Sequence, residues 1–159
     1  MQEVNLDKNS PGYGLIRDRA PSSPEIASIA SVGFGLTAIP IGVERGWITR
    51  RQGYERALST LKTLLYQTEQ LNGFFYHFMD IRTGKRAMKS ELSVIDTAIA
   101  ICGAITAGEY FGQGVKELAE ILYRRVQWGW YRDPRRNQFY MAILQKKVFR
   151  DGGIFMQNN

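Results

Sequence analysis

Apolar residues along this chain follow two alternating patterns, and both are typical of helices. From Pro24 to about Ile41, almost every large side chain is apolar and only small residues separate them. A helix that is apolar on every side is a buried helix. The next segment places Leu58, Leu61 and Leu65 on one face and charged residues elsewhere, which predicts an amphipathic surface helix.

The same two patterns occur a second time. The stretch from Ala98 to Ala107 is apolar, and after the break Phe111-Gly-Gln-Gly114 the segment VKELAEILYRRV has a single apolar stripe. In a simple bundle all four helices would be amphipathic. A buried helix followed by an amphipathic one, twice over, instead predicts an all-α fold with inner and outer helices in concentric layers, as in an α/α toroid.

Capping motifs predict where these helices begin. A Ser or Thr is followed three residues later by an acidic or amide side chain at Ser22 to Glu25, Thr49 to Gln52 and Ser93 to Asp96. Pro40 and Gly42 are expected to end the first buried helix.

A long insert separates the two helix pairs. Its aromatic-rich alternating run and the turn Thr83-Gly84-Lys85 predict a short β-hairpin around residues 73–90. The segments that precede two inner helices lie at the same end of a layered fold, so residues 13–24 and 72–96 are expected to converge there. The segment that follows the fourth helix is expected at the same end.

The converging segments carry carboxylates, aromatic rings and arginines, which together suit a sugar site. Carboxyl groups can protonate or activate, rings stack on sugar faces, and guanidinium groups bind hydroxyls. The carboxylates of interest are Asp80, Glu91 and Asp96. The candidate binding residues are Arg17, Asp18, Arg19, Tyr76, His77, Trp130 and Arg132.

Several of these residues also have a purely structural explanation. Asp96 can complement the dipole of a helix whose first turn contains it, and Asp80 can shape the hairpin. Glu91 can form a salt bridge with Arg82, Arg86 or Lys89. His77 can be a structural histidine. The tryptophans fit a wall or the core, and Cys102 is expected in the core.

Composition excludes several classes of function. The 159 residues contain one cysteine and one histidine, so neither an internal disulfide nor a Cys-rich or multi-histidine metal centre is expected, and no cofactor is implied. No phosphate loop, hydrolase triad, nucleic-acid module or apolar run of about 20 residues is present. The net charge is +6, but residues 132–159 hold six basic and two acidic residues, so the charge indicates no anionic partner.

Three long motifs carry a family resemblance. They are SIASVGFGLTAIPIGVERGWITR, NGFFYHFMDIRTGKRAMKSELSVIDTAIAICGAITAGEYF and WGWYRDPRRNQFYM. Together they resemble the bacterial glucoamylase-like family, relatives of endo-β-1,2-glucanases and of the central domain of cyclic β-1,2-glucan synthases. The resemblance runs from about Asp7 to Met141. Relatives usually have Trp-Asn where this chain has Met88-Lys89.

The resemblance implies an (α/α)6 barrel that acts on an oligo- or polysaccharide, with β-1,2-glucan favoured and the acidic site at one mouth. It implies a glycoside hydrolase with Asp80, Glu91 and Asp96 as the site carboxylates and His77 beside them. The resemblance does not assign which carboxyl group is the general acid and which is the base. A glucan transglycosylase and a sugar-binding remnant without activity are the alternatives. Relatives are often exported or membrane-attached, and this sequence contains no signal that decides the location.

A barrel of this kind has twelve helices, whereas four are predicted here. Residues 1–141 are therefore expected to be an N-terminal part of the domain that is inactive alone, with inner helices that can self-associate. After Met141 the resemblance stops. Read in a shifted frame with permitted codons, the tail gives GYLTKESFSGWWDIYAEQL, which matches the family's continuation, so residues 142–159 are interpreted as out of frame.

Overall fold

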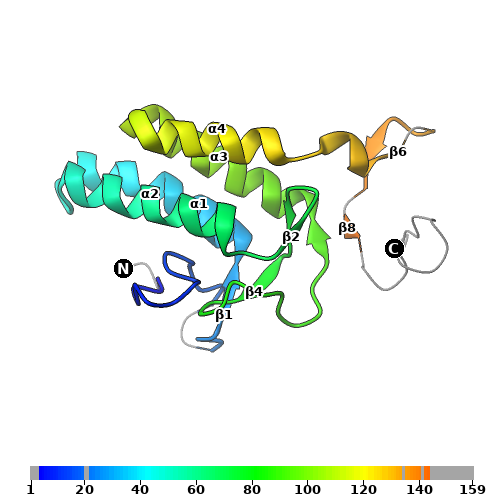
Figure 1. Ribbon diagram of the computed structural model, residues 1–159, viewed down its shortest axis with the longest axis horizontal. Coiled ribbons are helices and arrows are strands. Elements are labelled where there is room, and N and C mark those ends of the chain that lie inside the picture. The colour runs from blue at the N-terminus through cyan, green and yellow to red at the C-terminus, as the bar shows by residue number, and fades with distance from the viewer. Residues whose placement is uncertain (1–3, 20–21, 134, 141, 144–159) are drawn as a thin grey trace.

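The computed structural model of the chain describes residues 4–19, 22–133, 135–140 and 142–143 (Figure 1). The predicted out-of-frame tail lies outside this part, apart from the backbone of residues 142–143. The helices are α1 (Ile29–Glu44), α2 (Arg50–Tyr66), α3 (Val94–Phe111) and α4 (Gln113–Arg125). A 3-10 helix, Trp128–Tyr131, follows α4.

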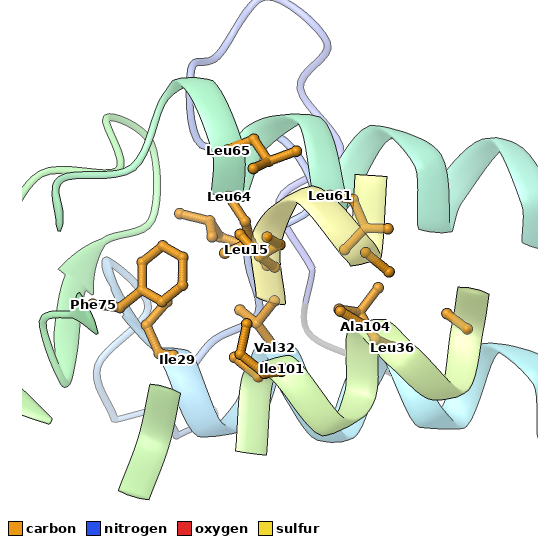
Figure 2. Packing of buried hydrophobic residues seen from close by; sticks show 14 of the residues in the cluster. Leu15, Ile29, Val32, Leu36, Leu61, Leu64, Leu65, Phe75, Ile101 and Ala104 are labelled. Carbon is orange, nitrogen blue, oxygen red and sulfur yellow. The ribbon is translucent and has the colours of Figure 1, made fainter. Parts of the chain in front are cut away.

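The four helices form two layers. α1 packs along the length of α3, while α2 and α4 contact each other and cover one side of that pair (Figure 1). The core lies between the layers, where Leu36 of α1 and Ala104 of α3 face Leu61 of α2 (Figure 2). The predicted inner helices are thus α1 and α3, and the predicted outer helices are α2 and α4.

The second long face of α1 and α3 is uncovered in the described part of the chain. Phe34 is 65% exposed and Ile105 is 41% exposed, although the sequence pattern predicts burial on all sides. Cys102, predicted as a core residue, is also exposed. These three predictions are wrong for one reason: apolar composition shows that a side chain favours burial, but no described element packs on this face.

Two of the three predicted helix starts are confirmed. Thr49 and Gln52 form a full capping box at α2, and the Ser93 hydroxyl accepts from the Asp96 amide at α3. The predicted box at Ser22 is wrong, because Ile26–Ser28 forms a strand and α1 begins only at Ile29. Pro40 lies inside α1, which continues to Glu44.

Short antiparallel pairs connect the helices. β1 (Ile26–Ser28) pairs with β4 (Phe78–Asp80), and β2 (Gln70–Leu71) pairs with β3 (Phe74–Phe75). β5 (Leu92–Ser93) pairs with β8 (Ala142–Ile143), and β6 (Arg132–Asp133) pairs with β7 (Gln138–Phe139). The predicted hairpin is present, because Met79 bridges Arg86 and the Gly84 amide donates to the Asp80 carbonyl at 2.9 Å.

Within the described residues, α3 alone is long and apolar enough to cross a membrane, judged by length and composition. Half of this helix is buried against the rest of the fold. Its packing along α1 and α4 is typical of a core helix.

Candidate functional site

His77 lies where the two inner helices begin. Its carbonyl accepts from the Ile29 amide at the start of α1 at 3.1 Å, and its own amide donates to the Glu91 carbonyl at 3.0 Å. One residue earlier, Tyr76 bridges Leu92, immediately before α3. The segment around His77 therefore joins the N-terminal ends of α1 and α3. Residues 13–24 reach the same end through β1, because the Ser28 amide donates to the Ile16 carbonyl at 3.3 Å and β1 pairs with β4, so the predicted convergence with residues 72–96 is present.

The His77 ring lies between two carboxylates. Its Nδ1 is 3.0 Å from Glu91 Oε1, and its Nε2 is 3.9 Å from Asp96 Oδ2. The ring stacks on Phe78, with centroids 3.8 Å apart. The side chains of His77 and Glu91 are 30% and 31% exposed, and that of Asp96 is 11% exposed. We call His77, Glu91 and Asp96 the His77 cluster; a ligand in solution can reach it.

Each member of the His77 cluster has a distinct support. Asp96 is the third residue of α3, where the helix dipole and the Ser93 cap fix the first turn. Glu91 lies directly before β5, and its backbone is bonded to His77. With the proton on Nδ1, the imidazole donates to Glu91 and turns a free Nε2 towards Asp96; when it is doubly protonated, both nitrogens carry a donor. The His77 imidazole can thus orient the Glu91 carboxylate and exchange a proton with it.

Asp80 has a different surrounding from the His77 cluster. Its Oδ1 accepts from the amides of Arg82 and Thr83 at 3.0 and 2.8 Å and from the Thr83 hydroxyl at 2.9 Å. Burial acts to raise the pKa of Asp80, but the Thr83 and Arg82 hydrogen bonds and the Arg82 charge together hold it below its ordinary value of 3.8. These bonds close the hairpin turn, as the structural explanation expects. A catalytic role for Asp80 stays a prediction.

Tyr76 does not present its ring to solvent. The residue is 1% exposed, and the Arg86 guanidinium covers the ring at 4.7 Å from its centroid. The ring therefore has the surroundings of a core residue, and a substrate-binding role for Tyr76 stays a prediction. The alternation of the aromatic run places neighbouring side chains on opposite faces, and it is His77 that faces outwards.

The remaining predicted binding residues lie around the same end of the fold and have partners of their own. Arg17 bridges Ala27 and donates through Nε to the Pro24 carbonyl at 2.9 Å. Asp18 and Arg19 pair with each other at 3.3 Å. Their binding roles stay predictions.

Trp130 and Arg132 follow α4. The Trp130 ring lies 6.3 Å from that of Phe74 and 5.1 Å from that of Tyr131, so it packs as a wall residue. Arg132 donates to the Asn137 side chain at 2.7 Å across the β6–β7 turn. Both remain candidates for substrate contact. Among the described residues, no group of three or more His, Cys, Asp or Glu side chains has the geometry to hold a metal ion.

Comparisons with known proteins give relatives of one kind. The chain is 30% identical over 147 residues to an exo β-1,2-glucooligosaccharide sophorohydrolase of Parabacteroides distasonis, and the match covers 83% of this chain. It spans only 20% of the length of that relative. No family model matches the sequence.

Solved structures agree with this result. A β-1,2-glucanase from Parabacteroides distasonis superposes with a TM-score of 0.76 at 27% identity, covering 91% of this chain and 23% of that protein. An endo-β-1,2-glucanase from Chitinophaga pinensis, solved with sophorotriose and glucose, gives 0.69 at 27% identity, covering 81% and 33%. A Bacteroides uniformis protein assigned as a glucoamylase gives 0.74 at 29% identity, covering 84% and 35%.

The likeness extends over most of this chain but over only about a fifth to a third of each relative. The chain is therefore homologous to glucoamylase-like and β-1,2-glucan-hydrolysing proteins, and its helices form part of an (α/α)6 barrel.

Proposed function

We propose that this chain supplies part of the site of a glycoside hydrolase, and that the His77 cluster contacts a β-1,2-linked glucan. The observation that carries the proposal is the His77 ring between Glu91 and Asp96, at the shared N-terminal end of the two inner helices. The names of the relatives point to the β-1,2 linkage.

Glycoside hydrolysis needs one carboxyl group to protonate the leaving oxygen and a second to activate water or attack the sugar carbon. Glu91 and Asp96 are carboxyl groups within reach of one solvent-accessible imidazole. We propose that the His77 cluster supplies one member of that pair and binds sugar hydroxyls. The second member comes from a part of the barrel that these 159 residues do not contain. This division predicts that the chain binds glucan but does not hydrolyse it alone.

Calorimetric titration with sophorotriose tests the proposal, with cellotriose as the linkage control. Removing a charged hydrogen-bond partner of a ligand costs about 1.5–3 kcal/mol, so Glu91→Ala and Asp96→Asn are each expected to weaken binding at least tenfold. Glu109→Gln is the matched control, because Glu109 lies near the opposite end of α3 and pairs with Lys116 at 2.9 Å. Equal affinity of the control and the site variants would refute the assignment.

We also propose that the uncovered face of α1 and α3 makes the chain self-associate. Phe34, Ile41, Ile95 and Ile105 are between 41% and 65% exposed on these two helices. Burying them yields roughly 25 cal/mol per Å² of apolar area. Sedimentation velocity is expected to show oligomers that Phe34→Ser with Ile95→Ser reduces to monomer, while Tyr66→Ser on α2 leaves them intact. A monomeric wild-type chain would contradict this proposal without bearing on glucan binding.

A further inference from the structure

Arg86 makes an unusual set of contacts next to the His77 cluster. Its Nε donates to the Ser90 carbonyl at 2.6 Å and its Nη2 donates to the Lys89 carbonyl at 2.8 Å. The guanidinium plane lies over the Tyr76 ring, and the backbone amide donates to Glu69 Oε2 at 2.9 Å. One side chain thus holds the backbone of the two residues that precede Glu91.

The backbone that Arg86 holds is strained. Met88 and Lys89 have φ of 54° and 53°, in the left-handed region that residues other than glycine rarely adopt. Each such residue costs on the order of 1–3 kcal/mol and persists only where its surroundings enforce it. The Arg86 guanidinium provides part of that enforcement because it donates to the carbonyl of the second strained residue and to the next one along the chain.

Hydrogen bonds also fix the path of Ser90 and Glu91, the two residues that follow the Met88–Lys89 turn. The Ser90 hydroxyl donates to the Phe78 carbonyl at 3.0 Å, and the Glu91 carbonyl accepts from the His77 amide. These two bonds tie Ser90 and Glu91 to the backbone of Phe78 and His77. The position of the Glu91 carboxylate on His77 Nδ1 therefore depends on where residues 88–90 are held.

We infer that Arg86 is a positioning residue of the His77 cluster: it holds the left-handed turn at Met88–Lys89 so that Glu91 reaches the His77 ring. The inference deepens the proposed function and rests on it for the effect on glucan binding, whereas the effect on the His77–Glu91 hydrogen bond stands by itself. A guanidinium suits this task because its planar fork reaches two carbonyls and stacks on an aromatic ring, which a lysine ammonium does not do.

The single histidine makes the test specific. In the ¹⁵N-labelled chain, the imidazole nitrogen signals belong to His77 alone, and Glu91→Ala marks the signal without its acceptor. We expect Arg86→Ala to move the Nδ1 signal most of the way to the Glu91→Ala position and Arg86→Lys to move it part of the way. Lys85→Ala, an exposed basic residue of the same hairpin, is expected to leave the signal unchanged.

A folded Arg86→Ala variant with the wild-type Nδ1 signal would overturn the inference. If Arg86→Ala does not fold, an unshifted Nδ1 signal in Arg86→Lys would overturn it in the same way. Val115→Ala creates a remote core cavity in α4 and controls for general loosening. An equal shift in Val115→Ala would also overturn the inference. Sophorotriose binding is measured on the same samples. Absence of binding by the wild type together with a shifted signal in the Arg86 variants rejects the proposed function and supports the role of Arg86.

Discussion

Gly103 of α3 lies against the backbone of Gly33 of α1, so closely that a Cβ on Gly103 would be 2.1 Å from the Gly33 carbonyl oxygen. A Cβ on Gly33 would in turn be 2.5 Å from the Ile99 carbonyl oxygen. Neither side chain fits without moving a helix. The inner helices thus meet through their backbones, and this contact sets the spacing of the helix starts between which His77 is held.

Gly103→Ala is expected to destabilise the fold because the added methyl meets backbone atoms that cannot rotate away. Overpacking of this kind costs about 1–3 kcal/mol in the free energy of unfolding, measured by urea denaturation. Gly129→Ala is the matched control, since its added Cβ has nothing within 4 Å. A loss for Gly103→Ala no larger than for this control would show that the helices are not in backbone contact.

Thr49→Ala is expected to lower the free energy of unfolding by about 1 kcal/mol, the usual loss for an N-cap. The Thr49 hydroxyl accepts from the Gln52 amide at 3.2 Å, and the Gln52 side chain accepts from the Thr49 amide at 2.8 Å. Ser22→Ala is the matched control, because Ser22 is the one of the three predicted capping residues that caps no described helix. Its unfolding midpoint in urea is expected to equal that of the wild type, and equal losses in both variants would contradict the observed start of α1.

Asp80→Ala is expected to weaken the hairpin in a pH-dependent way. The pKa of Asp80 is lower in the folded chain than its ordinary value of 3.8, so its carboxylate stabilises the fold fully above that value. This contribution is lost as the pH falls from 3.8 through the lower folded pKa. The difference in unfolding free energy between wild type and variant is therefore expected to be constant from pH 7 to 5 and to shrink towards pH 3. A difference that grows with acidity would have the wrong sign.

The sequence predicted those elements whose hydrogen bonds are local. The Thr49 capping box and the Ser93 cap involve residues three apart, and both are present. The Ser22 box is equally good as a pattern, but Ile26–Ser28 pairs with a strand about 50 residues away, and that pairing delays the helix. A local pattern does not show a distant competitor.

The sequence predicted which kinds of side chain form the candidate site better than it predicted how they are arranged in space. His77, Glu91 and Asp96 were identified from chemistry and resemblance, and the structure brings their side chains together. The burial of the Tyr76 ring was not predicted, because alternation alone does not decide which neighbour faces outwards. Arg86 was considered only as a salt-bridge partner, because the left-handed turn that it holds has no glycine to reveal it.

The most direct test of the central claim is titration of the ¹⁵N-labelled chain with sophorotriose while the His77 imidazole signals are followed. Saturable shifts of Nδ1 and Nε2 are predicted, together with loss of those shifts in Glu91→Ala and their absence with cellotriose. Unchanged His77 signals at sophorotriose concentrations that saturate binding elsewhere on the chain would contradict a glucan site at the His77 cluster.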